Sequence, residues 1–436
     1  MNGAPSSEAT PTPLEQARFL AGQGRIVEAE FIYRKLLESS PDLVEGLNFV
    51  AMCVHARGEP TQAGMLLERA RLAAPDDAET LKNLGLVYRA LGNDAGAIDA
   101  LQGALRQEPA YFLARLHLAG LLQQAGRDGE ALPHYFRAVK DAQARGRWLN
   151  ESTTPPGVRA SVLHAMNTID AGRLALFQNS FAPLREKFGA SALHRVEDAL
   201  GIYLGTRAAD YPDPRQKPLF LFFPGIASRP YYDRAQFPWL GELEAATESI
   251  RAELTRMLRE DHGFEPFLRT DGPADLENYL RGSQGAPTWN GYFFYRHGER
   301  YNDNCARCPQ TISVLDALPI VRIREHAPEV LFSVLTPGSH ILPHRGVTNT
   351  RLVTHLPLLV PPDCALRVGG EEHVWREGHC VVFDDTYEHE AWNRSGQTRV
   401  VLILDTWHPD LTEVERAAVT DLVGVIGDFN QKSGAH

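Results

Sequence analysis

The sequence predicts two unlike folds in one chain: an α-helical repeat solenoid in the first third and a β-rich jelly-roll barrel in the last third. Small residues recur every 34 positions over the first third, a period typical of stacked helical hairpins. From Gly291 onward, short runs rich in β-branched and aromatic residues are separated by Gly, Pro and Asn. Many short strands without intervening helices are typical of a sandwich or barrel. With 436 residues, the chain has room for two or three domains.

Three sets of residues carry the 34-residue period in a common register: Gly24, Gly58, Gly92 and Gly126; Ala29, Ala63, Ala97 and Ala131; and Pro41, Pro75 and Pro109. We expect each unit to be a helix, a turn and a second helix. The small residues let two helices approach, the glycine permits the turn, and the proline ends the second helix. Residues 14–145 resemble four tetratricopeptide repeats (TPRs). Such an array favours a concave surface for a peptide or protein partner; a scaffold or dimerisation arm is the alternative.

The rest of the chain divides by composition. Residues 1–13 are predicted to be a disordered tail, and 146–215 a helical bridge ending in a Pro-rich linker. Residues 216–425 are expected to form the β-rich domain, entered by a strand at 219–225, and 426–436 a second tail.

Within the β-rich domain, an amphipathic helix is expected first and short strands after it. The helix is predicted at 240–258, and the strands at 292–296, 329–336, 350–359, 365–368, 379–383 and 398–405.

Charge and composition limit the classes of function. The formal net charge is −11, which argues against nucleic-acid binding because that needs a basic surface. No run approaches 18 apolar residues, so no transmembrane segment is expected. Five cysteines are few for a disulfide scaffold, and they indicate a reducing compartment such as the cytoplasm.

Five segments of the last third follow one another in an order and spacing that resemble the aspartyl/asparaginyl β-hydroxylase family, a branch of the 2-oxoglutarate oxygenases. They are LFSVLTPGSH at 331–340, PHRG at 343–346, TNTRLVTHL at 348–356, FDDTYEHEAW at 383–392 and DTWHPDLT at 405–412. The resemblance implies a double-stranded β-helix of the cupin type that binds Fe(II) and 2-oxoglutarate. Larger members of the family also carry repeats before this domain.

The resemblance assigns the metal to His344 and His389, and the oxoglutarate carboxylate to Arg399 helped by Ser333. His355 would lie near the other end of the oxoglutarate. The residue chemistry agrees, because two neutral imidazoles suit iron and leave coordination positions open for other ligands. A buried guanidinium grips a carboxylate with two parallel hydrogen bonds.

The common facial triad adds a carboxylate two positions after the first histidine, where this sequence has Gly346. Glycine at this position is the pattern of the family, in which water is thought to fill the vacant site. Asp384 and Asp385 precede His389, and their place at the end of a strand favours loop capping. Nothing in the sequence transfers either of them to the metal.

The resemblance implies a dioxygenase that yields hydroxylated substrate, succinate and CO2, with ascorbate as a supporting reductant. The expected substrate is an Asp- or Asn-like carbon of a peptide, protein or small molecule, with an anionic group gripped by Arg351. Better-known members have a second arginine two positions later, where this chain has Val353. The alternatives are a lipid or other small-molecule hydroxylase, and a catalytically silent barrel in a TPR interaction module.

Overall fold

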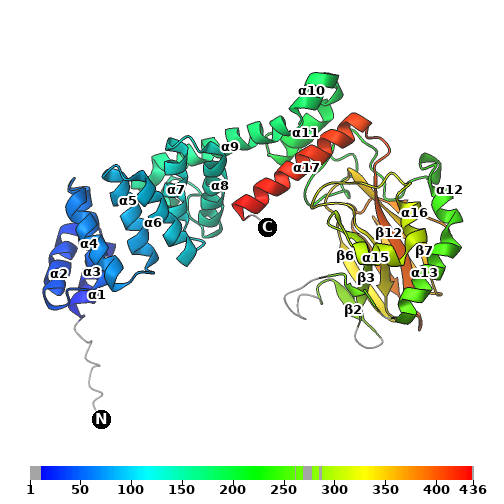
Figure 1. Cartoon of the computed structure of the whole chain (residues 1–436), viewed down its shortest axis with the longest axis horizontal. Helices are drawn as coiled ribbons and strands as arrows, with labels where there is room; N and C mark the ends of the chain where they lie inside the picture. The colour runs from blue at the N-terminus through cyan, green and yellow to red at the C-terminus, as the bar shows by residue number, and fades with distance from the viewer. Residues whose placement is uncertain (1–10, 261, 269–276, 284–286, 435–436) are drawn as a thin grey trace, which may run out of the picture. The chain divides into compact units, whose positions relative to one another are not determined.

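The computed structural model describes residues 11–260, 262–268, 277–283 and 287–434 of the chain. Its contacts separate two compact units (Figure 1). The first unit contains the residues up to Arg173 and those from Phe429 onward, and the second unit contains Leu174–Asp428. Two long helices, α9 (Arg159–Ser180) and α17 (Glu413–Ser433), run across the boundaries between the units.

Helices in consecutive hairpins build the first unit (Figure 1). They are α1 (Pro13–Gly22) with α2 (Ile26–Ser39), α3 (Val44–Ala56) with α4 (Pro60–Ala73), α5 (Ala78–Ala90) with α6 (Asp94–Gln107), and α7 (Phe112–Gln124) with α8 (Asp128–Ala144). The four periodic glycines join the helices of each pair at φ between +72° and +85°. The periodic alanines, such as Ala29 and Ala63, are fully buried between helices. The predicted helical-repeat solenoid is therefore confirmed.

Both predicted tails need correction. Residues 1–10 lie outside the described part of the chain, but α1 already begins at Pro13. Its N-cap is Thr12, whose side chain accepts from the backbone N–H of Glu15 while the Glu15 carboxylate accepts from the N–H of Thr12. The tail predicted from residue 426 is the second half of α17, where the Phe429 ring packs against Phe136 at 5.1 Å.

The second unit opens with helices and continues into the sheets. The helices before the sheets are α10 (Ala182–Phe188), α11 (His194–Tyr203), α12 (Leu240–Ala245) and α13 (Thr247–Glu260), and α15 (Asn302–Arg307) and α16 (Pro309–Leu315) lie between strands. The single helix predicted at 240–258 is interrupted at Ala246. There the Thr247 hydroxyl donates to the carbonyl of Glu244, which ends α12 and starts α13.

Two antiparallel sheets form the core of the second unit. One has the order β1-β3-β5-β12-β7-β10, with β4 beside β3, and the other has the order β2-β6-β11-β8-β9. The strands are β1 (Glu265–Pro266), β2 (Leu280–Gly282), β3 (Trp289–Arg296), β4 (Glu299–Arg300), β5 (Val330–Leu335), β6 (Ser339–His344), β7 (Arg351–Leu359), β8 (Cys364–Val368), β9 (Glu371–His373), β10 (Val381–Phe383), β11 (His389–Asn393) and β12 (Arg399–Trp407). From β5 to β12 the chain winds between the two sheets, which is the expected double-stranded β-helix.

Strand alternation decides which side chains reach the barrel interior. On β5 and β12, Phe332 and Leu402 point to an outer apolar layer completed by α12, α13 and α16 (Figure 1). Leu335 on β5 and Val401 on β12 have the opposite parity, so they point between the sheets, into an inner cluster with Trp289. Ser333 and Arg399 have the parity of this inner set, so the sheet turns both polar side chains inward.

The predicted linker and entry strand form an irregular strap instead, which is buried at Gln216 and again at 221–223. Gln216 is fully buried, and the N–H of Lys217 donates to the carbonyl of Thr386. The N–H of Leu219 donates to the carbonyl of Gly346, and Leu221 makes only an isolated parallel bridge to Thr348. The backbone of this segment thus bonds to two separate loops, at 346–347 and at Thr386, and it pairs with no strand over a regular ladder.

Candidate functional site

The two predicted metal ligands are cross-strand neighbours. His344 ends β6 and His389 begins β11, and the two residues face each other directly in the antiparallel register. Their ring centroids are 4.0 Å apart, with an angle of 52° between the ring planes. Neither β6 nor β11 was among the predicted strands, although both histidines were predicted. The sheet therefore brings together two side chains that are 45 positions apart in the sequence.

Each imidazole is held by the backbone two residues before it. Nδ1 of His344 donates to the carbonyl of Leu342 at 2.8 Å, and Nδ1 of His389 donates to the carbonyl of Tyr387 at 3.1 Å. This bonding puts the ring proton on Nδ1 and leaves the Nε2 lone pair available as a metal ligand. Burial lowers the pKa of both rings, that of His389 to about 3, so both are neutral.

Arg399 is a fully buried cation of the site. Its side chain begins β12, is 1% exposed and lies 3.3 Å from the Ser333 hydroxyl through Nη1. The Trp289 indole N–H donates to the same hydroxyl, and the centre of the Trp375 ring lies 5.1 Å from the guanidinium carbon. Burial lowers the pKa of Arg399 to about 10, so it stays charged at neutral pH. Its Nε has no hydrogen-bond partner among the described residues, which suits a guanidinium that awaits a carboxylate.

His355 lies on β7 in the same interior. Its ring packs between Phe383, at 4.9 Å, and Trp375, at 5.9 Å. Burial and the charge of Arg399 hold the pKa of His355 well below its usual range. Its Nδ1 is buried without a partner among the described residues, so a polar group of a ligand can satisfy it.

Gly346 and Asp385 share one space. A Cβ on Gly346 would lie 2.1 Å from Cγ of Asp385, and the Gly346 N–H donates to the Asp385 carbonyl at 2.6 Å. The carboxylate of Asp385 thus fills the volume in which a side chain at position 346 would begin. The glycine is needed for space, because its φ is not in the left-handed region.

The two adjacent aspartates have different roles. Asp384 caps the loop as expected, accepting from the backbone N–H of Thr386 at 2.9 Å and from the Gln216 amide at 2.5 Å. Asp385 instead faces the cavity, and its Oδ1 has no hydrogen-bond partner among the described residues. Sequence reasoning missed it, although its position four residues before His389 and the small residue at 346 were visible signals.

Arg351 is not a free anion clamp. Its guanidinium donates to Asp405 and lies 3.5 Å from the carboxylate of Asp385. Burial disfavours its charge, but these two carboxylates outweigh that effect and raise its pKa. The predicted grip on a substrate carboxylate would therefore have to displace an internal ion pair.

A cavity of about 270 Å³ joins these residues. It is lined by Ser333, His344, Arg351, His355, Asp385, His389 and Arg399, with apolar walls from Phe267, Trp289, Ile341, Val347, Val353, Phe383 and Ile403. His340 does not line it, and its Nε2 instead meets the Glu390 carboxylate at 2.7 Å. Among the described residues, no group of three or more His, Cys, Asp or Glu converges as a metal cage. Two imidazoles with open space beside them still fit a ferrous ion that takes other ligands from a chelating keto acid.

Comparison with known proteins agrees with this arrangement. Residues 244–409 match the family model described as aspartyl/asparaginyl beta-hydroxylase. These residues are therefore similar to that family over the part of the chain that carries the cavity. The human aspartyl/asparaginyl beta-hydroxylase is 24% identical over 363 residues, which are 82% of this chain and 42% of the relative. The chain thus spans less than half the length of that relative.

Another relative is named for a different activity. The ornithine lipid ester-linked acyl 2-hydroxylase of Rhizobium tropici is 34% identical over 194 residues, 44% of this chain and 65% of the relative. The chain is therefore similar to hydroxylases whose named substrates differ.

The repeats also have neighbours among solved structures. A thermophilic TPR protein of Thermus thermophilus has a TM-score of 0.29 and 24% identity over 35% of this chain and 79% of its own. The repeat fold itself rests on the 34-residue register and on the helix pairs. No described helix is both long enough and apolar enough to cross a membrane.

Proposed function

We propose that the chain is an Fe(II)- and 2-oxoglutarate-dependent dioxygenase. One observation carries the proposal: two opposed imidazoles, each held by the backbone at Nδ1, share a cavity with a fully buried arginine whose Nε has no hydrogen-bond partner among the described residues. When bound, the ferrous ion and oxoglutarate supply oxygen activation, and the keto acid is oxidised to succinate and CO2. A catalytically silent barrel would have no use for this combination of buried groups.

Each residue of the chain has a defined task in this proposal. His344 and His389 present Nε2, because the backbone carbonyls of Leu342 and Tyr387 hold the opposite nitrogens. Arg399 binds the distal carboxylate of oxoglutarate, with the Ser333 hydroxyl as a second donor. His355 holds a neutral ring near the other end of the keto acid, and the apolar walls exclude water.

The first substrate class is an Asp- or Asn-like carbon of a peptide, protein or related small molecule. The human relative, named for aspartyl and asparaginyl groups, supports this class over 82% of the chain. In this proposal the TPR array recruits a peptide or protein substrate to the domain, in the cytoplasm. A carboxylate of the substrate would compete with Asp385 and Asp405 for Arg351.

A second class, an acyl chain or other apolar small molecule, is favoured by one specific observation. The charge of Arg351 is already neutralised, and Val353 adds an apolar wall at a position where better-known family members have arginine. The cavity thus offers few free charges away from Arg399. The lipid-hydroxylating relative supports this class.

The test of the chemistry is succinate formation by the purified full chain with Fe(II), oxoglutarate and ascorbate. We expect slow turnover without substrate, lost in His344→Ala and His389→Ala. His340→Ala is the matched control, because that histidine lies on the same strand outside the cavity. Equal succinate formation in all variants would overturn the proposal.

The test of the substrate is the gain of one oxygen, followed by mass spectrometry in an extract split into peptide and lipid fractions. A mass shift confined to the peptide fraction supports the Asp- or Asn-like class. A shift confined to the lipid fraction supports the acyl class and contradicts the first.

A further inference from the structure

The outer side of the first repeat keeps apolar residues that the inner repeats bury. Phe19 on α1 is 63% exposed, whereas its counterparts one, two and three periods later, Cys53, Val87 and Leu121, are at most 9% exposed. Val87 shows why, because a Cβ built on Gly64 of the preceding hairpin would lie 3.6 Å from it. Inner repeats are covered by the hairpin before them, and among the described residues nothing covers the first.

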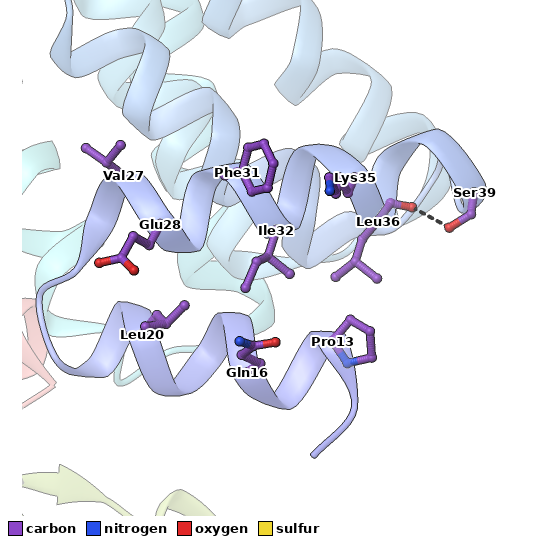
Figure 2. Close-up of a pocket in the computed structure, with 10 residues that line it drawn as sticks. All are labelled: Pro13, Gln16, Leu20, Val27, Glu28, Phe31, Ile32, Lys35, Leu36 and Ser39. Atoms are coloured by element: carbon purple, nitrogen blue, oxygen red, sulfur yellow. Dashed lines mark hydrogen bonds between the residues drawn. The ribbon is translucent and has the colours of Figure 1, made fainter. Parts of the chain in front are cut away.

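The first repeat also has a groove between α1 and α2 (Figure 2). It has a volume of about 810 Å³, and Leu20 of α1 and Val27, Phe31 and Ile32 of α2 supply its apolar lining. Val27 is 81% exposed and Phe31 is 59% exposed. An exposed apolar groove of this kind marks a contact surface.

The large apolar residue at position 27 is particular to the first repeat. Its counterparts one, two and three periods later are the small residues Thr61, Ala95 and Gly129. The later repeats therefore lack the larger apolar side chain that widens the apolar lining of the groove. The first repeat differs from the others where a partner would touch it.

The charges along α2 indicate which partner fits. Glu28 and Lys35 lie two turns apart on one stripe of α2, on either side of Phe31 and Ile32. Arg25, the N-cap before the helix, pairs with Glu28 of its own chain. Glu28 and Lys35 line the groove, and the Lys35 ammonium lies 4.5 Å from the centre of the Phe31 ring. The order along the stripe is minus, apolar, plus, so the charges have opposite signs at positions symmetric about its centre.

Such a pattern is complementary to itself when reversed. If two α2 helices pack antiparallel about a point between Phe31 and Ile32, Glu28 of each faces Lys35 of the other. The aromatic ring of Phe31 then meets Ile32 of the opposite helix at the centre. A parallel arrangement would place like charges side by side.

We propose that this face of the first repeat docks on the same face of a second copy of the chain, with the two α2 helices antiparallel about a two-fold axis. The axis passes beside Phe31 and Ile32. Each groove then receives the α2 ridge of the other copy, much as an inner repeat is covered by the preceding hairpin. The contact uses no residue of the second unit.

The experiment is sedimentation equilibrium of the full chain over a dilution series at low salt. The wild type is expected to form a dimer, and Glu28→Lys and Lys35→Glu are each expected to weaken it about tenfold or more. Each reversal changes both symmetric pairs from attraction to repulsion. The double variant E28K/K35E is expected to dimerise like the wild type, and a mixture of the two single variants is expected to form mixed dimers.

Asp99→Lys is the matched control, because Asp99 is the counterpart of Phe31 two periods later and is exposed outside the face. It is expected to leave the dimer unchanged, and circular dichroism checks that every variant keeps its helices. Three results would overturn the proposal. They are a monomer throughout a series reaching about 0.1 mM, a dimer insensitive to both single reversals, and a failure of the mixed single variants to pair.

Discussion

Two glycines, one in each unit, have no room for a side chain, but the neighbouring groups that occupy the space differ. A Cβ on Gly85 in the repeat array would lie 2.6 Å from Cγ of Leu101, within an apolar interface. A Cβ on Gly346 in the second unit would lie 2.1 Å from Cγ of Asp385, a buried carboxylate. The array uses the missing side chain to bring two helices together. The second unit uses the missing side chain to hold a carboxylate beside His344.

The comparison teaches that the array is specified by packing and the cavity by buried charge. The repeats use the same kind of helix interface several times, so the loss of one contact destabilises mainly the repeats that share it. In the barrel, Arg351, Asp385 and Asp405 depend on one another because none is well solvated. Substitutions in the two units should therefore fail in different ways.

The largest effect is expected at Gly346. Gly346→Ala must displace Asp385 and with it the loop before His389, so we expect turnover of oxoglutarate to fall about 100-fold or more. Gly85→Ala meets the buried side chain of Leu101 in an apolar interface and should cost about 1–3 kcal/mol in stability while leaving turnover unchanged. Succinate assays and urea unfolding of both variants check this. Full activity of Gly346→Ala would show that the position of Asp385 does not matter.

The next effect concerns Arg351, for which a structural ion pair and the predicted binding of a substrate carboxylate can be separated. Arg351→Ala leaves Asp385 and Asp405 buried without a cation, and we expect a loss of about 3–5 kcal/mol in the free energy of unfolding. Arg345→Ala is the control, since Arg345 also lines the cavity but mainly donates to the carbonyl of Arg215. Unchanged stability with loss of substrate-dependent turnover alone would favour the role in substrate binding predicted from the sequence.

A smaller effect is expected at the oxoglutarate end. Arg399→Lys keeps the charge but loses the planar fork, so the KM for oxoglutarate should rise about tenfold or more with a smaller change in kcat. Trp375→Leu removes the ring beside the guanidinium and should raise KM less. Steady-state kinetics with varied oxoglutarate measure both. A fall in kcat with KM unchanged in Arg399→Lys would contradict the assignment.

The smallest effect belongs to the array and depends on pH. Hydrogen bonds from Arg57, joined by Arg34, lower the pKa of Glu30 to about 2. Since this value lies below that of the unfolded chain, the stabilisation is present above about pH 4.5 and is lost as the pH falls toward 2. Glu30→Gln should cost about 1–3 kcal/mol near pH 6 and much less near pH 2.5. A difference that stays constant over that range would contradict the ionised pairing.

The repeat array could be predicted from the sequence because its interfaces are local and repeated. The register of Ala29 and Ala63 fixes where two helices touch, and each glycine in the series marks a turn. Where the helices end was less predictable, because Thr12 capping and the continuation of α17 depend on single hydrogen bonds and distant packing.

For the cavity, the sequence supplied the residue types but not their surroundings. His344, His389 and Arg399 were predicted from motifs and converge as expected on one cavity. Asp385 and the strap through Gln216 were not predicted, because their roles arise from contacts between segments far apart in the chain. The pairing of Arg351 with Asp405 is likewise a contact across neighbouring strands that no local pattern reveals.

The central claim is that two opposed imidazoles hold one ferrous ion. Equilibrium dialysis of Fe(II) under anaerobic conditions, with the full chain and oxoglutarate present, tests it most directly. The account predicts one bound iron per chain for the wild type and for His340→Ala, and greatly weakened binding for both His344→Ala and His389→Ala. Iron bound equally well by all four proteins, or by none of them, would contradict it.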